Sequence, residues 1–118
     1  MTKIRIGVLG ATRGMDFAMR ALVSNPHAEV TDICESHDGL LERAKSEAEG
    51  KGLRVRWHDD VTSFLGADFD AVILANYFHQ HAPFAIKALE AGKHVMSETS
   101  ACFTLAEGVA LVEAVEKS

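Results

Sequence analysis

The stretch "GVLGATRGMDF", Gly7–Phe17, contains most of a phosphate-binding turn. Such turns in dinucleotide sites read G-x-G-x-x-G. When Gly10 takes the first glycine place, Thr12 stands in the second and Met15 in the third, while Gly14 lies one place early. A structural strand-to-helix turn without a ligand is the alternative interpretation of so incomplete a motif.

The chemistry of such a turn is anion binding, because free N–H groups and the positive dipole end of the following helix point at the ligand. Gly10 permits the turn, Thr12 is small and carries a hydroxyl that can donate to a phosphate, and Arg13 adds positive charge. The sequence therefore predicts a pyrophosphate at Gly10, Thr12, Arg13, Gly14 and Met15.

A carboxylate follows where a dinucleotide site needs one. Glu35 ends the second predicted strand, roughly 25 residues after Gly10, and an acid there accepts hydrogen bonds from the adenosine ribose. Its charge repels a 2′-phosphate, so NAD is favoured over NADP, although Ser36 and Arg13 keep NADP open. The alternative is a solvated carboxylate at a strand end.

The second stretch of chemical interest is "NYFHQHAP", where His79 and His81 flank Gln80. Residues at i and i+2 do not share a helix face, so we expect no metal site here. Taken alone, the two histidines are surface or capping residues.

Strand-like and helix-like segments alternate along the whole chain and would position these residues. The strands are expected at 3–9, 28–34, 53–57, 70–75 and 93–97, and the helices at 14–24, 36–52, 59–66, 81–92 and 104–118. This alternation predicts an α/β fold, a doubly wound Rossmann-type parallel sheet of order 3-2-1-4-5 with helices on both faces. Ligands of such sheets bind beyond the carboxyl ends of the strands, where the motifs above lie.

Two helices carry specific expectations. The first helix should bury one face, and the last should begin with a capping box of Thr104 and Glu107. The expected faces are Gly14, Ala18, Ala21 and Leu22 in the first helix, and Leu105, Val109 and Val112 in the last.

The bulk composition excludes several classes of protein. The 118 residues suit one domain, and the net charge of −5 gives no basic surface for nucleic acid. No apolar run approaches the ~20 residues that span a membrane, and the N-terminus is expected to be a strand and not a signal peptide. Cys34 and Cys102 form no C-x-x-C pair, so we expect a cytoplasmic protein without disulfides.

The segments "IRIGVLGA" and "DFDAVILANYFHQHAPFAIKALEAGKHVMSE" resemble the N-terminal Rossmann domain of the Gfo/Idh/MocA oxidoreductases. That family carries D-A-V-x-I-A-T-P-N-x-x-H, then A-L-x-A-G-K-H-V and E-K-P. Here residues 76–78 occupy the T-P-N places, His81 falls on the family histidine, and residues 88–95 agree at every specified position.

The resemblance implies an NAD(P)-binding domain of an enzyme that transfers hydride between the nicotinamide and a sugar, polyol or similar small alcohol. It places Asn76, His79 and His81 in the middle of the cleft, and Glu98 and Thr99 near the nicotinamide. Thr99 replaces the family lysine and cannot supply its charge or act as a general acid–base group. We therefore assign no catalytic residue and expect no turnover by this chain alone.

The resemblance also implies that residues 1–118 are a dinucleotide-binding domain whose C-terminal substrate domain is absent, so that a small-molecule substrate binds only with that domain. The surface that would face it should be apolar and favour self-association into a homo-oligomer. A non-catalytic nucleotide-binding or regulatory module of the same fold is one alternative, which Thr99 favours. A methyltransferase is another, against which the missing second glycine and residues 88–95 argue.

Overall fold

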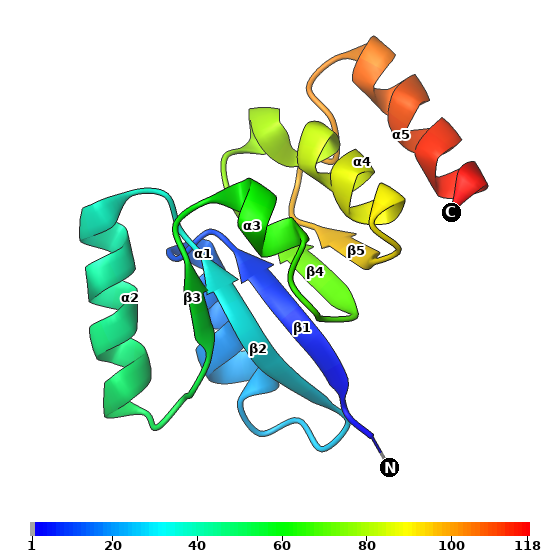
Figure 1. The fold of residues 1–118 in the computed structure, drawn as a ribbon. Coiled ribbons are helices and arrows are strands. Elements are labelled where there is room, and N and C mark those ends of the chain that lie inside the picture. Colours follow the sequence, from blue (N-terminus) through cyan, green and yellow to red (C-terminus); the bar gives the residue numbers. More distant parts are fainter. Residues whose placement is uncertain (1) are drawn as a thin grey trace.

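The computed structural model describes residues 2–118, which form a five-stranded parallel sheet of order β3-β2-β1-β4-β5 (Figure 1). The predicted order is confirmed. The strands are β1 (Ile4–Leu9), β2 (Ala28–Cys34), β3 (Arg56–His58), β4 (Ala71–Leu74) and β5 (His94–Ser97). The third strand lies at a sheet edge as expected, but it is shorter than predicted and begins only at Arg56, where pairing to Asp32 starts.

Helical segments connect the strands. They are α1 (Arg13–Asp16), the π-helix η1 (Phe17–Leu22), α2 (Asp38–Gly50), α3 (Val61–Leu65), the 3₁₀ turn η2 (Phe78–Gln80), α4 (His81–Glu90) and α5 (Leu105–Lys117). Asp60 caps α3 by accepting a hydrogen bond from the Ser63 N–H at 2.9 Å. The predicted capping box of Thr104 and Glu107 at α5 is confirmed. None of these helices is long and apolar enough to cross a bilayer.

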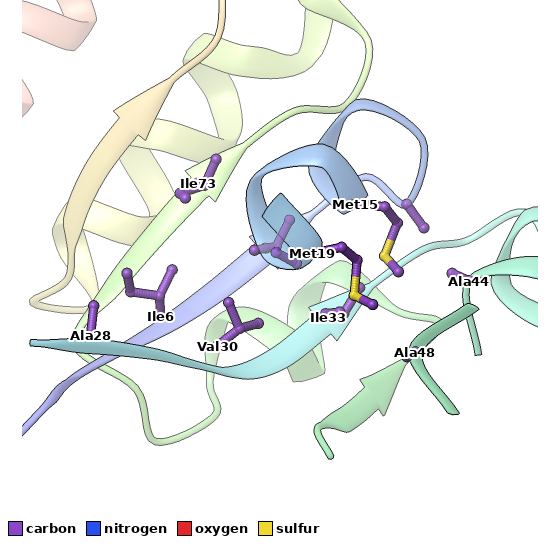
Figure 2. Close-up of a cluster of buried hydrophobic side chains, with 12 residues drawn as sticks. Ile6, Met15, Met19, Ala28, Val30, Ile33, Ala44, Ala48 and Ile73 are labelled. Atoms are coloured by element: carbon purple, nitrogen blue, oxygen red, sulfur yellow. The ribbon is translucent and has the colours of Figure 1, made fainter. Parts of the chain in front are cut away.

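Two hydrophobic clusters cover the two faces of the sheet. Side chains alternate along a strand, so Ile73 of β4 enters one cluster while Val72 and Leu74 enter the other. The first cluster receives side chains from α1, η1 and α2 (Figure 2), and the second receives them from α3 and α4.

The first helix differs from the predicted face. Gly14 and Ala18 are buried as expected, but Ala21 is exposed and Met15 and Met19 enter the core (Figure 2). The cause is the π-helical turn of η1, which adds a residue to each turn and shifts the buried face toward the methionines.

The last helix leaves its predicted apolar side uncovered. Leu105 is 86% exposed, and Val109 and Val112 are also exposed. Leu111, on another side of α5, packs against the second cluster beneath α4. The stripe of Leu105, Val109 and Val112 therefore has no partner among the residues that the structure describes.

Candidate functional site

A cavity of about 490 Å³ lies at the carboxyl ends of β1, β2 and β4. This is where the chain leaves β1 and β4 in opposite directions across the sheet, the expected ligand position of a doubly wound fold. Its volume falls within the range of small-molecule sites. Six of the predicted site residues line it, namely Gly10, Thr12, Arg13, Glu35, Ser36 and Asn76.

Gly10 has a backbone conformation that other residues rarely adopt, with φ at +101°. A Cβ at this position would lie 2.6 Å from the carbonyl oxygen of Ala75, which follows β4. The Gly10 N–H donates to the Cys34 carbonyl at 2.9 Å. Because Gly10 has no side chain, the turn passes close to the ends of β4 and β2, and its backbone lines the cavity.

The turn after Gly10 presents unused donors. The described part of the chain contains no backbone hydrogen bond from the N–H groups of Thr12, Arg13 or Gly14, and Thr12 caps nothing with its side chain. Gly14 is also where the helix touches the sheet, because a Cβ there would lie 2.5 Å from the Val8 Cγ1. Three successive free N–H groups at a cavity edge suit an anionic ligand.

Glu35 braces this turn. Its Oε1 accepts a hydrogen bond from the Ala11 N–H at 2.9 Å, and its Oε2 accepts one from the His37 N–H at 3.0 Å. Each carboxylate oxygen has a second lone pair and can still accept a hydroxyl hydrogen. The carboxylate therefore holds the glycine turn against the start of α2 and remains an acceptor toward the cavity.

Arg13 reaches across the turn to the end of β5. Its Nε lies 3.8 Å from Oε2 of Glu98, and its Nη1 lies 3.5 Å from Oδ2 of Asp16. The guanidinium also lies 5.5 Å from the centre of the Phe17 ring. These contacts bring Glu98, which does not line the cavity, to the same edge of the sheet as the turn.

Asn76 contributes an unsatisfied acceptor. Its Nδ2 donates to Gln80 Oε1 at 3.2 Å, while its Oδ1 is buried and has no hydrogen-bond partner within residues 2–118. A buried acceptor without a donor carries a cost of about 1–3 kcal/mol. Such a group beside a cavity is suited to a donor supplied by a ligand.

Six predicted site residues lie outside the cavity wall, and two of them, Gly14 and Glu98, are described above. Met15 is buried in the first cluster, and its N–H donates to the Thr12 carbonyl at 3.2 Å. His79 is exposed and stacks on Tyr77, with 5.8 Å between ring centres, and Thr99 is exposed beyond β5. His81 is almost wholly buried and contacts backbone carbonyls of two loops.

Sequence reasoning missed the apolar part of the site. Leu40 of α2, Val61 of α3 and Phe84 of α4 line the cavity, although they lie far apart in the sequence. The sequence analysis assigned them no role, because no local signal distinguishes a residue that ends beside a cavity. Tyr77, next to Asn76, also lines it.

The chain matches known proteins over nearly its full length. A family model described as an oxidoreductase family with an NAD-binding Rossmann fold matches residues 4–118. The chain is similar to the crystal structure of the WlbA dehydrogenase from Chromobacterium violaceum in complex with NADH and UDP-GlcNAcA, with a TM-score of 0.84 and 32% identity. That match covers 98% of this chain and 32% of the other.

Two curated relatives add sequence similarity. A dTDP-3,4-didehydro-2,6-dideoxy-alpha-D-glucose 3-reductase from Streptomyces violaceoruber is 35% identical over 100 residues, 80% of this chain and 27% of the relative. A glycosyl hydrolase family 109 protein from Shewanella sp. (strain W3-18-1) is 26% identical over 124 residues, 100% of this chain and 27% of the relative. The chain thus spans about a third or less of the proteins it matches.

Proposed function

The chain belongs to the Gfo/Idh/MocA oxidoreductase family with its NAD-binding Rossmann fold, and we propose that it holds the nicotinamide dinucleotide of an enzyme that oxidises or reduces a sugar, polyol or similar small alcohol. The observation that carries the proposal is the cavity at the switch point, lined by the glycine turn, Glu35 and Asn76. The nicotinamide supplies the hydride chemistry when bound, and the residues of this domain bind and orient it.

The residues present fit a dinucleotide. The pyrophosphate meets the free N–H groups of the turn from Thr12 to Gly14 and the guanidinium of Arg13. Glu35 and Ser36 hold the adenosine ribose, and the unpaired Oδ1 of Asn76 accepts a hydrogen bond from the nicotinamide half. Met15 supports the turn indirectly, because its side chain packs into the first hydrophobic cluster.

The remaining predicted residues have smaller parts. Glu98 approaches the nicotinamide side and is held there by Arg13. His79 and Thr99 lie at the exposed rim, where they contact the cofactor only at its nicotinamide end. Thr99 offers no ammonium group where the family resemblance places a lysine, so this domain supplies no proton to the reaction.

NAD is the preferred cofactor in this proposal. The Glu35 carboxylate is anchored by two backbone N–H groups, so it cannot swing away from a 2′-phosphate without losing both hydrogen bonds. The negative charge of the Glu35 carboxylate repels the 2′-phosphate, and this repulsion disfavours NADP. Arg13 lies on the pyrophosphate side of the turn, where its ion pairs with Asp16 and Glu98 hold it away from the ribose.

The substrate class rests on the relatives. The WlbA structure contains UDP-GlcNAcA, and the Streptomyces relative is named for a dTDP-sugar. We propose a sugar or polyol as the substrate of the whole protein. Because the matched relatives are about three times longer, the 118-residue chain alone is expected to show no turnover with any sugar or polyol.

Calorimetric titration of the chain with NAD and NADP tests the proposal. NAD should bind with a dissociation constant between micromolar and millimolar, more tightly than NADP. The variant Glu35→Ala should bind NAD about tenfold more weakly, because it loses an acceptor for the ribose and the brace of the turn. Glu35→Ala should also lower the ratio of the affinity for NAD to the affinity for NADP.

Glu47→Ala is the matched control, because Glu47 is an exposed glutamate of α2 outside the cavity. It should leave both affinities unchanged. Equal NAD affinity in the wild type and Glu35→Ala would remove Glu35 from the site, and an absence of NAD binding would overturn the proposal.

A non-catalytic nucleotide-binding or regulatory module is the second candidate, and Thr99 favours it. The two candidates share the cofactor site and differ in turnover. Comparing oxidoreductase activity in a full-length relative before and after exchanging threonine and lysine at the position of Thr99 separates them. Activity that persists with threonine supports the oxidoreductase function. Activity only with lysine supports the non-catalytic module.

A further inference from the structure

Four aromatic side chains meet beyond the carboxyl ends of β4 and β5 and form a cluster that we call the aromatic rim. Tyr77 and His79 stack with 5.8 Å between ring centres, and His79 meets Phe78 edge to face at 5.8 Å. Phe78 in turn meets Phe103 edge to face, with 5.6 Å between ring centres. The aromatic rim therefore joins the loop after β4 to the loop after β5.

The larger rings of the rim are exposed. Tyr77 is 70% exposed, Phe78 51% and Phe103 64%. Contiguous apolar surface of this kind marks a binding site in soluble proteins. Tyr77 and Phe78 stand where the family pattern has proline and asparagine, so this surface belongs to this chain and not to the family motif.

The rim continues outward from the cofactor cavity. Tyr77 lines the cavity, whereas the other three rings lie beyond its wall. The loop after β5, which carries Phe103, also carries Glu98 and Thr99, the residues that the proposed function puts at the nicotinamide end. A substrate that exchanges hydride must lie against the nicotinamide, so the rim adjoins the place of the substrate.

The charge of the two loops indicates which kind of chemical group the rim contacts. Residues 76–81 and 98–104 contain no lysine or arginine, and their one acidic residue, Glu98, pairs with Arg13. A phosphate would therefore meet neither of the residue types that bind it best. The loop after β5 instead exposes the hydroxyl-bearing Thr99 and Ser100. Aromatic faces beside hydroxyls suit an uncharged ligand that has apolar faces and hydroxyl edges.

We propose that the aromatic rim is the substrate subsite of this domain and takes an uncharged cyclic sugar or cyclitol, packed with one C–H face against the rings. An aromatic face is negative and attracts the weakly positive C–H groups that a sugar ring presents together on one side. An open-chain polyol must first be ordered, which costs conformational entropy, so the rim favours ring-shaped substrates over linear ones. Calling this ligand the substrate rests on the proposed function, whereas the contact between sugar ring and rim does not.

Saturation-transfer difference NMR of the whole chain tests the contact. Methyl glucopyranoside is the cyclic probe and sorbitol the linear probe, each at about 100 mM because a single stacking contact gives weak affinity. With NAD saturating and the aromatic protons of the protein irradiated, the glucoside should receive more saturation than sorbitol. The protons on one face of the glucoside ring should receive more than those on the other face.

Tyr77 provides a second measurement on the protein itself. It is the only tyrosine of the chain, so its ring resonances are unambiguous. These resonances should shift on titration with methyl glucopyranoside and stay in place with sorbitol.

Phe78→Leu is the decisive variant, because it keeps an apolar side chain at the centre of the rim and removes the ring. Transfer to the glucoside should fall about threefold, the loss expected for one aromatic contact, and Phe78→Tyr should restore it. Phe103→Leu, at the outer ring, should lower the transfer in the same direction. Val23→Ala, which shortens an exposed side chain without a ring near the end of η1, should behave as the wild type.

Equal transfer to the glucoside and sorbitol would contradict the proposal, as would a signal that neither Phe78→Leu nor Phe103→Leu lowers. Uridine monophosphate is a third probe. If it shifts the Tyr77 ring with NAD saturating while the glucoside does not, the rim binds a nucleobase and the proposal fails.

Repeating the glucoside measurement without NAD separates this inference from the proposed function. If calorimetry detects no NAD binding but the glucoside still contacts the rim, the proposed function fails and the rim remains a sugar site. If NAD binds and the glucoside receives no saturation, the rim proposal alone fails.

Discussion

At the scale of single residues, the turn after β1 depends on the absence of a Cβ at Gly10. Gly10→Ala places a Cβ 2.6 Å from the Ala75 carbonyl oxygen at a φ of +101°. We expect a loss of about 2–4 kcal/mol in the free energy of unfolding, measured by urea titration.

Gly50→Ala is the control for Gly10→Ala, because a Cβ at the end of α2 meets nothing within 4 Å and φ there is ordinary. It should change stability by about 1 kcal/mol or less, toward greater stability. Equal effects at Gly10 and Gly50 would contradict the close approach of the turn to β4.

The two cysteines should differ in reactivity. Burial, followed by the charge of Glu35, raises the pKa of the Cys34 thiol to about 12. Cys102 is partly exposed. Since the thiolate is the nucleophile, iodoacetamide at neutral pH should modify Cys102 first and Cys34 only after unfolding, as followed by mass spectrometry. Equal rates in the folded chain would count against the burial of Cys34.

The sequence predicted where several site residues lie but not their contacts. The position of Glu35 follows from a strand end, and the need for a glycine at position 10 follows from the motif. That Glu35 accepts from Ala11 and His37 depends on how two loops meet, which no spacing encodes. The burial of His81 likewise depends on a loop 19 residues further along the chain.

At the scale of elements, β1 and β4 are joined at their amino-terminal ends by Arg5 and Asp70. The Arg5 Nη2 donates to Asp70 Oδ1 at 2.8 Å, and the Arg5 backbone N–H donates to Oδ2 at 2.8 Å. These hydrogen bonds, the side-chain one first, lower the pKa of Asp70 from 3.8 to about 2.

Because the folded pKa is the lower one, the stabilisation by Asp70 is present above pH 3.8 and is lost as pH falls through about 2. Asp70→Asn should therefore be less stable than the wild type at neutral pH and lose less stability between about pH 4 and 2. Urea midpoints measured against pH check this. Asp59→Asn, at an exposed loop carboxylate, should keep the wild-type slope.

Patterns of period and capping predicted most elements, because strands, caps and closing glycines leave local signals. Thr104 caps its helix as expected, Asp60 caps α3, and Gly52 and Gly92 adopt positive φ after α2 and α4. The π-helix η1 left no such signal. Its wider turn brings Met19 against the sheet and leaves Ala21 exposed, so the predicted face failed at Ala21.

At the scale of the whole molecule, the uncovered stripe of α5 predicts self-association of the chain. Val109→Lys should shift the equilibrium toward the monomer, because it puts a charge in the centre of the stripe. Sedimentation over a wide range of concentrations measures this. Val23→Lys, at an exposed valine near the end of η1, should not change the association. A wild type that stays monomeric at every concentration would contradict the prediction.

The central place of β1 has a consequence for synthesis on the ribosome. β2 leaves the exit tunnel soon after β1 and can pair with one of its edges, but the other edge waits for β4, which lies more than half the chain further on. During that interval the nascent chain displays an open strand rich in Ile and Val, a template for wrong pairing with a neighbouring nascent chain. Slow translation of residues 35–70 should therefore lower the yield of native protein.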